Sequence, residues 1–473
     1  MYKKYARISV LAMLAVVVLA CAAFAAPVHL QSPNWEPNTK LVLNQMLDMY
    51  GTGGAKHTEN PRPYAVFDYD NTISILDVEE QLAIYQLENL RFAITPDMMY
   101  KVLITGVPDV NKSCGEDYDN KTVAEVAADA AAAYAKLYAK GWVAADASKA
   151  KYKEEWLQTA DWKEFATKAR WLYDAIGDTY SVDVSYPWIT YWFTGMTSKE
   201  IQQLAYESHT FYDKLGKTYP FAWKKCKWTS PANYSSKAGQ LTIGFNQCIT
   251  VSPELKELIA ALDADGIDMW ICSASHLDVI KAAPAAFGLK GVDGIVAMTN
   301  KFDKNGKMLN EYDYALHDQT QGVGKSTTIV KCIAPKYKGR GPILTCFDSQ
   351  GDFNFVTEFK DTAVGLCLNR QRKDDAGLCA AIAVWQNKHG IDLPKAQAMG
   401  DTRYVLQGRE ENNGAHLWAK TETHLLGKGT AVFSSKAEKW YAMLENGTKP
   451  GELLNQCTKL THKLKTYIGY KTR

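Results

Sequence analysis

The sequence predicts an α/β protein with a mostly parallel central sheet that is flanked by helices and interrupted, after its first strand, by a large and mainly helical insert. From residue 251 onward, short apolar runs alternate with amphipathic segments of helical period, a pattern typical of parallel strands joined by helices. One further apolar run, 64–67, stands far upstream of them. The helical stretch that separates the two parts is too long for a loop and predicts a folding unit of its own.

Length and composition agree with this class. The chain has 473 residues, enough for two or three folding units, and 47% hydrophobic against 22% charged residues is the balance of a globular protein. A largely disordered chain, a collagen and a coiled coil are excluded as the dominant state.

The first 25 residues have the pattern of a secretory signal peptide. Lys3, Lys4 and Arg7 precede an uncharged stretch at 10–19, and small residues follow up to Ala25. The uncharged stretch is shorter than the roughly 20 residues of a membrane span. We therefore predict a signal peptide over 1–25, a periplasmic or secreted mature protein, and no stable membrane span within it. A lipoprotein modified at Cys21 is a minor alternative.

The remaining chain is nearly neutral. Without the three basic residues of the signal segment, 51 Lys and Arg stand against 52 Asp and Glu. This balance, without a long basic run, argues against nucleic acid and anionic membranes as partners. We expect a small-molecule partner, and the oligomeric state stays open.

The expected elements follow one another along the chain. Residues 26–72 and 251–400 form the predicted core, 73–250 a helical cap with a small β hairpin near 220–250, and 401–473 a C-terminal extension that packs on the core. Inside the core we expect a helix near 41–50, a strand at 64–67, a helix from Ser252 and Pro253 to Gly266, a strand at 267–272, a helix at 277–287, a strand at 294–298, a hairpin at 301–314, a helix from about 324, and strands at 343–347 and 363–368.

The cysteine count is odd for the oxidising compartment that the signal peptide implies. The chain has ten cysteines, and with Cys21 in the signal segment an odd number remains, so at least one thiol is unpaired or bridges two molecules. Polar or glycine-containing surroundings favour two disulfides, and apolar runs favour buried thiols. The expected bridges are Cys226–Cys248 and Cys367–Cys379, and the expected buried thiols are Cys272 and Cys346.

Polar residues gather where the predicted strands end. The first strand is followed by Asp68 and Asp70, the second by Ser273 and Ser275, and the fourth by Asp348, Ser349 and Asp352, while Lys325 opens the helix before that fourth strand. Ligands of an open parallel sheet bind beyond the carboxyl ends of its strands. Carboxylates suit Mg²⁺, and lysine and serine offset the charge of phosphate oxygens, so these residues predict a site for both.

The residues at these strand ends resemble the motifs of a known family. Asp68-Tyr-Asp70-Asn-Thr72 resembles the first motif of the haloacid dehalogenase (HAD) superfamily, and Trp270-Ile-Cys-Ser273-Ala-Ser resembles the second. Lys325 suits the third and Asp348-Ser-Gln-Gly-Asp352 the fourth, in the family's order over about 64–370. Asp77-Val-Glu79-Glu80 and Gln407-Gly-Arg-Glu-Glu-Asn-Asn-Gly414 are similar to segments of the bacterial phosphorylcholine phosphatases and their phosphoserine phosphatase relatives. The resemblance implies a Rossmann-like core with its cap after the first strand.

One departure from the family is visible. Phe347 stands where the fourth motif usually has glycine before its first acid, and we expect its side chain to crowd the loop.

The resemblance also implies a role for each site residue. Asp68 would be the nucleophile that forms an aspartyl-phosphate, and Asp70 the general acid and base, a residue that favours a phosphatase over a dehalogenase. Mg²⁺ would be held by Asp68, Asp348 and Asp352 and by the backbone carbonyl of Asp70. Ser273, with Thr72, Ala274 and Lys325, would bind the phosphate. Lys331 in the same helix is the alternative to Lys325.

Two features leave alternatives open. Asp77, Glu79 and Glu80 either meet a cationic group of the substrate or form the acidic first turn of a helix. The tryptophans of the insert either pack its helices or, in part, cage a quaternary ammonium group.

The stretch Gly322–Thr327 is not a P-loop, because Gln319 occupies the place of its first glycine and no strand leads into it.

The expected function is therefore an Mg²⁺-dependent phosphomonoesterase for a small organic phosphate. Its alternatives are a phosphotransferase and a non-catalytic secreted binding protein or surface antigen that retained the fold.

Overall fold

The computed structural model describes residues 27–216, 224–412 and 416–457. The predicted signal peptide lies outside these residues, as does Trp223 of the insert. Among the helices described, none is both long and apolar enough to cross a lipid bilayer.

A seven-stranded sheet lies at the centre, in the order β13-β12-β11-β10-β1-β6-β7. β1 runs parallel to both of its neighbours, with Ala65 opposite Leu344 of β10 and Met269 of β6. The remaining pairs are parallel too, except that the edge strand β13 is antiparallel to β12. The predicted fold class is confirmed. The strands are β1 (Tyr64–Phe67), β6 (Asp268–His276), β7 (Gly294–Met298), β10 (Leu344–Phe347), β11 (Val364–Leu368), β12 (Arg403–Arg409) and β13 (Leu417–Trp418).

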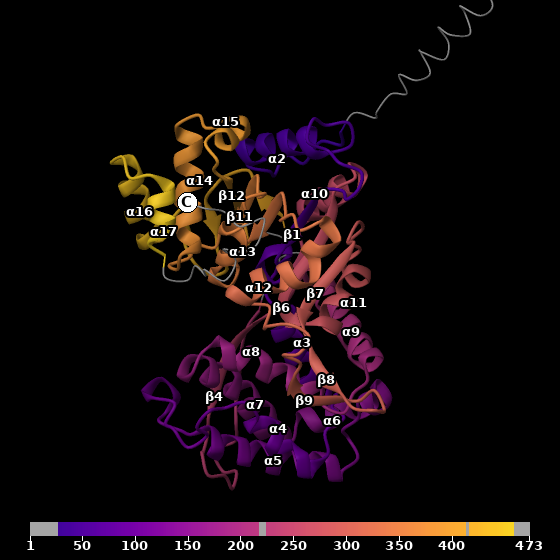
Figure 1. The fold of residues 1–473 in the computed structure, drawn as a ribbon. Helices are drawn as coiled ribbons and strands as arrows, with labels where there is room; N and C mark the ends of the chain where they lie inside the picture. The colour runs from indigo at the N-terminus through magenta and orange to yellow at the C-terminus, as the bar shows by residue number, and fades with distance from the viewer. Residues whose placement is uncertain (1–26, 217–223, 413–415, 458–473) are drawn as a thin grey trace, which may run out of the picture.

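Helices cover both faces of this sheet because its strands are apolar on both sides. Ala65 and Phe67 of β1 point into one buried cluster, which they share with α2, α10 and α11. Tyr64 and Val66 point into the opposite cluster, shared with α13 and α14. Figure 1 shows the sheet between these helices. The helices of the core are α2 (Pro37–Tyr50), α10 (Pro253–Ala264), α11 (Leu277–Phe287), α12 (Val323–Thr328), α13 (Phe353–Thr357), α14 (Ala376–Lys388), α15 (Leu393–Ala398), α16 (Ser435–Glu445) and α17 (Pro450–Asn455).

The chain between β1 and β6, apart from the core helix α10, builds the helical insert, seen mostly in the lower half of Figure 1. Its entry and exit pair as a short antiparallel ribbon of β2 (Ser74–Ile75) and β5 (Thr250–Val251). The insert has a hydrophobic core of its own, in which Trp156, Trp162, Trp171, Trp188 and Trp192 are all buried. Its helices are α3 (Val78–Asn89), α4 (Pro96–Ile104), α5 (Val123–Ala139), α6 (Lys153–Leu157), α7 (Ala160–Thr179), α8 (Val182–Thr190) and α9 (Ser198–Gly216).

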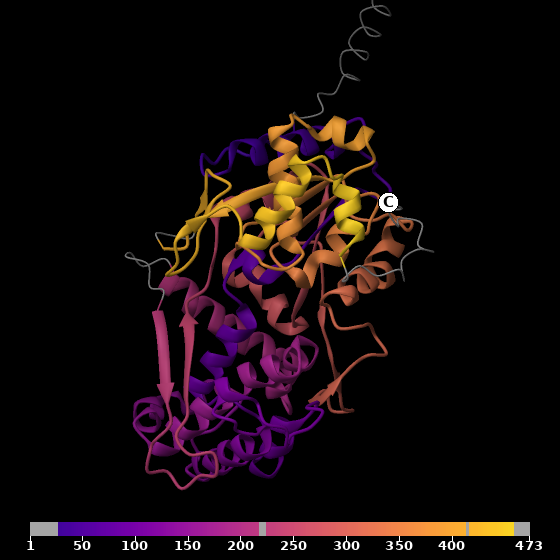
Figure 2. The same ribbon diagram turned by 90° about the vertical axis from the view of Figure 1, so that its left-hand side faces the viewer.

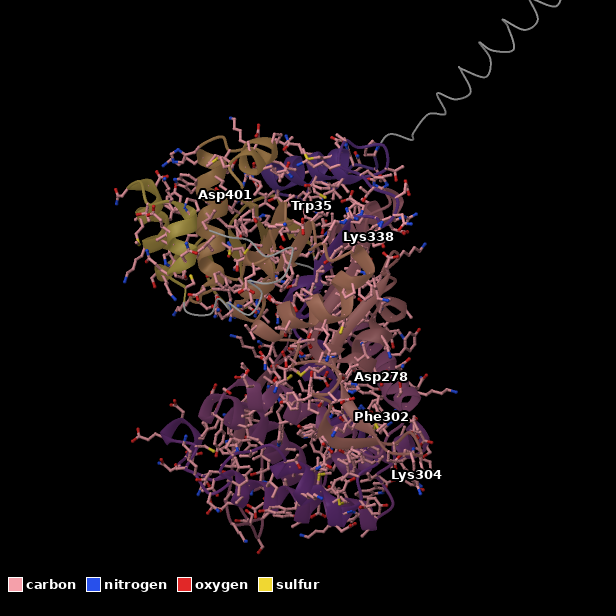
Figure 3. All side chains as sticks on the ribbon, viewed as in Figure 1. Trp35, Asp278, Phe302, Lys304, Lys338 and Asp401 are labelled. Carbon is pink, nitrogen blue, oxygen red and sulfur yellow. The ribbon has the colours of Figure 1, made fainter. Side chains whose placement is uncertain are left out.

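Two hairpins flank the insert on different sides, as Figure 2 shows. The first pairs β3 (Lys224–Thr229) with β4 (Thr242–Gln247), within the predicted range. The second pairs β8 (Asn300–Phe302) with β9 (Met308–Tyr312) and belongs to the core. Figure 3 labels Phe302 and Lys304 on this second hairpin, beside the helices of the insert. Its Met308 exchanges backbone hydrogen bonds with Gly195 and Met196 at 2.9 and 2.8 Å, which fastens core to insert.

The C-terminal part of the chain differs from the expectation. We expect residues 401–473 to be an extension packed on the core, whereas Arg403–Arg409 forms β12 inside the central sheet, and the short pair β14 (Thr423–His424) and β15 (Thr430–Ala431) follows it. Every residue of β12 is buried. The strand was not predicted because its two arginines and Gln407 interrupt the apolar run by which a buried strand is identified in a sequence.

The expected disulfides are wrong. None of the nine cysteines in the ranges that the structure describes forms a disulfide. The Sγ of Cys226 donates to Gln247 Oε1, whereas that of Cys248 donates to the carbonyl of Tyr212, so these two thiols have different partners. Cys367 lies in β11 and Cys379 in α14, both buried in the same apolar cluster. Spacing and local polarity do not report how such side chains are oriented. Cys272 and Cys346 are buried thiols, as expected.

Candidate functional site

A cavity of about 890 Å³ opens beyond the carboxyl ends of the central strands, where the insert meets the core. The core side of this cavity carries the predicted acids and the lysine. The insert contributes residues from α3, α7 and α8. Site residues of the described chain that line it are Asp68, Asp70, Asp77, Glu79, Ala274, Ser275, Lys325, Asp348 and Asp352.

The loop that follows β1 holds the first two acids at the mouth of the sheet. The Asp68 amide donates to the carbonyl of Cys346 in β10 at 3.0 Å, which continues the strand pairing up to Asp68. Asn71 then adopts a left-handed conformation with φ 60°, which asparagine tolerates better than most residues. This turn brings the Thr72 hydroxyl back to donate to Asp68 Oδ2 at 2.8 Å and to Asp348 Oδ1 at 3.3 Å.

Lys325 lies between two of the acids. Its ammonium donates to Asp68 Oδ1 at 2.5 Å and to Asp352 Oδ1 at 2.6 Å, and its side chain is only 2% exposed. Burial by itself lowers the pKa of Lys325, but the charges of Asp352 and Asp68 outweigh it, so the pKa is raised and the ammonium stays charged. Lys331 is exposed and donates to the carbonyl of Ala315 instead.

Burial and mutual repulsion raise the pKa of Asp68 and Asp352. For Asp68 burial comes first, followed by the charge of Asp352, while Lys325 acts in the opposite direction. Burial likewise raises the pKa of Asp352, against the neighbouring ammonium. Asp68 and Asp352 therefore need positive charge nearby in order to stay ionised.

The same acids have the donor set of a divalent cation site. Asp68, Asp348 and Asp352 offer oxygen atoms that all lie within 4.8 Å of one another. Carboxylate oxygens are the ligands that Mg²⁺ prefers. When ionised, these three and Asp70 carry four negative charges, against two cations in direct contact with them. Both chemistry and charge therefore fit Mg²⁺.

The Asp70 side chain contacts β6 and is not one of the three carboxylates that could bind a cation. Its Oδ2 accepts from the hydroxyls of Ser275 at 2.7 Å and Ser273 at 3.3 Å, and its Oδ1 accepts from the Val78 amide at 2.7 Å. Burial raises the pKa of Asp70, against the hydrogen bonds from Ser275 and Val78 that lower it. Its carboxyl group thus retains its proton at a higher pH than an exposed aspartate does.

Ser273, the serine predicted to bind phosphate, does not line the cavity. Ser273 is fully buried and lies outside the cavity lining, whereas Ala274 and Ser275 line the cavity. The reason is that β6 continues to His276, so Ser273 still belongs to the strand and accepts from the Ser275 amide at 3.0 Å. His276 is the N-cap of α11.

The three acidic residues beyond the first loop have separate partners. Asp77 caps α3 by accepting from the amides of Glu79 and Glu80, the structural role of a helix start. Glu79 accepts from the His276 amide at 2.7 Å, and its other oxygen is buried without a partner among the described residues. Burial raises the pKa of Glu79 to about 8. Glu80 pairs with Arg170 at 3.7 Å.

Sequence reasoning missed two arginines and two tyrosines at this site. Arg370, which follows β11, donates to Asp348 Oδ2 at 2.8 Å and lines the cavity. Arg409, at the end of β12, donates to the carbonyl of Asn71 at 2.6 Å. Tyr173 and Tyr186 supply the aromatic lining from the insert, and no tryptophan of the described residues joins them. Arg370 could have been predicted from the sequence, because it follows a core strand just as the predicted acids do.

The expected crowding at Phe347 does not occur. Its side chain is fully buried in the cluster beneath the sheet, away from the loop. The loop closes by hydrogen bonds from the amides of Asp348 and Ser349 to Asp352 Oδ2, both at 3.3 Å.

Comparisons with known proteins show the fold alone. The chain is similar to the solved structure of a conserved, functionally unknown protein from Anaerococcus prevotii, with 24% identity, 84% of this chain and 99% of that chain covered, and a TM-score of 0.68. A protein of unknown function from Bordetella pertussis and a HAD family hydrolase from Salmonella enterica serovar Typhi give TM-scores of 0.30 and 0.29. They share 11% and 10% identity, over 72% and 66% of this chain and 97% and 65% of theirs, too little to carry an argument. No protein-family model and no curated protein matches the chain.

Proposed function

We propose that the protein is a secreted or periplasmic, Mg²⁺-dependent phosphomonoesterase of the HAD type, which hydrolyses a small organic phosphate through an aspartyl-phosphate on Asp68. One observation carries the proposal. Two aspartates of a single loop, Asp68 and Asp70, line a cavity in which the buried Lys325 contacts Asp68. Asp348 and Asp352 offer oxygen atoms within 4.8 Å of those of Asp68. Nucleophile, proton donor and positive charge are thus available at one place.

The proposed reaction has two displacements. In the first, a carboxylate oxygen of Asp68 forms a bond to phosphorus while the bond from phosphorus to the ester oxygen breaks, and Asp70 gives its proton to that oxygen so that the alcohol leaves. In the second, Asp70 takes a proton from water as the water oxygen bonds to phosphorus. The bond between phosphorus and Asp68 then breaks, and inorganic phosphate is released. The raised pKa of Asp70 suits a group that starts protonated.

Positive charge near Asp68 is needed because the nucleophile and the phosphate repel each other. Lys325 supplies one such charge directly. Mg²⁺, when held by Asp68, Asp348, Asp352 and the backbone carbonyl of Asp70, would supply Lewis-acid stabilisation of the phosphoryl oxygens. Thr72 keeps Asp68 oriented by its hydrogen bond.

The cavity favours a small substrate with a cationic leaving group, such as a phosphorylcholine-like or phosphoserine-like ester. Asp77 and Glu79 line the cavity together with Tyr173 and Tyr186, and carboxylates and aromatic faces both attract an ammonium group. Glu79 has a buried oxygen without a partner among the described residues, which the N–H groups of a primary ammonium, as in a phosphoserine-like ester, would satisfy; the quaternary ammonium of a phosphorylcholine-like ester has no N–H to donate. Glu80 contributes less, since it already pairs with Arg170.

A panel of small phosphomonoesters, assayed for phosphate release with Mg²⁺ and with a chelator, tests the proposal. We expect hydrolysis that needs Mg²⁺ and is abolished in Asp68→Asn, whereas Asp97→Asn, an exposed position on α4, keeps full activity. Wild-type protein that hydrolyses no ester would contradict the proposal and favour a binding protein. Phosphorylated product after addition of alcohol acceptors would identify a phosphotransferase.

Export is tested separately. Cell fractionation with N-terminal sequencing is expected to find the mature protein outside the cytoplasm, beginning at Ala26. Uncleaved protein in the cytoplasm would contradict the signal peptide.

A further inference from the structure

We propose that Arg409, in the C-terminal strand β12, is a positioning residue for the chemical step, because it fixes the loop that carries Asp68, Asp70 and Thr72. The proposal rests on the proposed function. It also makes the C-terminal part of the chain, to which the sequence assigned no chemistry, a component of the active site.

Arg409 lies at the correct edge of the sheet. β12 runs parallel to β11, so its last residue stands at the carboxyl edge, where the site residues after β1 and β10 also stand. The side chain is 1% exposed, and its Nη1 donates to the backbone carbonyl of Asn71 at 2.6 Å. The contact joins residues 338 positions apart.

Asn71 forms the turn of the loop that carries Asp68, Asp70 and Thr72. It is the left-handed residue between Asp70 and Thr72, and its amide donates to the carbonyl of Leu76 at 3.3 Å. Rotation of the peptide that follows Asn71 would move the Thr72 hydroxyl away from Asp68, to which it donates. A charge-assisted hydrogen bond to the Asn71 carbonyl prevents this rotation.

The guanidinium group is itself held in place. Its Nη2 donates to Glu411 Oε1 at 2.7 Å, and Glu411 Oε2 accepts from the Leu426 amide at 2.9 Å. A planar guanidinium with two fixed partners cannot turn, whereas a lysine ammonium has no such fork. Arg409 therefore holds the Asn71 peptide at a defined position relative to the end of β12.

The chain provides a matched control in the same strand. Arg403 begins β12 at the opposite edge of the sheet, is equally buried, and donates to Asn38 Oδ1 at 3.0 Å, far from the cavity lining. Arg403→Met and Arg409→Met thus remove the same group from the same strand. If β12 mattered only for folding, both variants would lose activity alike.

The experiment measures kcat and KM of the full-length enzyme for p-nitrophenyl phosphate with saturating Mg²⁺. We expect Arg409→Met to lower kcat by about 10-fold to 100-fold, as misplaced catalytic groups do, with KM changed less than about threefold. Arg409→Lys is expected to recover part of kcat, and Arg403→Met to stay within about twofold of the wild type.

Each further outcome has a defined meaning. A kcat of Arg409→Met equal to that of Arg403→Met, or a change in KM alone, would overturn the inference. If Arg409→Met does not fold, Arg409→Lys decides, since an unchanged kcat in that charged variant would overturn it as well. Wild-type protein without phosphatase activity would instead refute the proposed function on which the inference rests.

Discussion

Replacing Lys325 by methionine tests the electrostatics of the site without any substrate. Methionine is similar in length but carries no charge, so the change leaves Asp68 and Asp352 buried without the ammonium that now contacts both. Removing one partner of a buried ion pair typically destabilises a protein by about 3–5 kcal/mol. We expect a loss of this size in Lys325→Met.

This loss converts to a modest change in melting temperature. An unfolding entropy of about 2.1 cal/mol/K per residue over 473 residues amounts to roughly 1 kcal/mol/K. Cooperative unfolding would therefore lower the melting temperature by about 3–5 °C. The deficit should shrink as the pH falls, because the raised pKa values of Asp68 and Asp352 let them become neutral early.

Thermal unfolding followed by tryptophan fluorescence measures these effects, with chelator and with Mg²⁺. Mg²⁺ should raise the melting temperature of Lys325→Met more than that of the wild type, since a divalent cation replaces the missing positive charge. Lys331→Met is the control, because Lys331 is exposed in the next helical turn and should change stability by less than about 0.5 kcal/mol. Equal melting temperatures for the two variants, at all pH values, would refute the reasoning.

Three further predictions concern neighbouring residues. Arg370→Gln should weaken Mg²⁺ binding by about 10-fold to 100-fold in calorimetry of substrate-free protein, because Asp348 loses the donor that orients it; unchanged affinity would contradict this. Asp70→Asn should slow turnover by about 10²-fold to 10⁴-fold with folding intact, measured as initial rates beside a circular dichroism spectrum. Glu79→Gln should equal the wild type in stability below about pH 4, become the more stable protein as the pH rises towards 8, and show the full difference above pH 8. The raised pKa of Glu79 makes its ionisation costly only in the folded state, and parallel stability curves would exclude this.

Much of the site follows from local sequence, because strand ends are local features. The apolar run of β1 stops at Phe67, and the acids that follow it must stand at the sheet edge. The same reasoning placed Asp348 after β10 and Lys325 near the start of a helix. In the structure Lys325 contacts Asp68, 257 positions away, and Asp348 contacts Thr72, 276 positions away. A parallel sheet makes this possible, since all its carboxyl ends lie on one side.

Other features depend on side-chain direction, which spacing does not contain. The sequence favoured Ser273 over Ser275 at the site, but only the length of β6 decides which hydroxyl reaches the cavity. It also paired Cys226 with Cys248, although their thiols have different partners. It expected Phe347 to crowd a loop from which its side chain points away.

The sequence by itself determined the α/β class, the place of the helical insert and the acids and lysine of the site, because apolar runs and the residues that end them are local properties of the chain. Only the tertiary structure decided that β12 completes the sheet and that Arg370 and Arg409 reach Asp348 and the loop after β1. The physical reason is that a buried arginine is stabilised by partners distant in sequence, and its own neighbours along the chain do not reveal them.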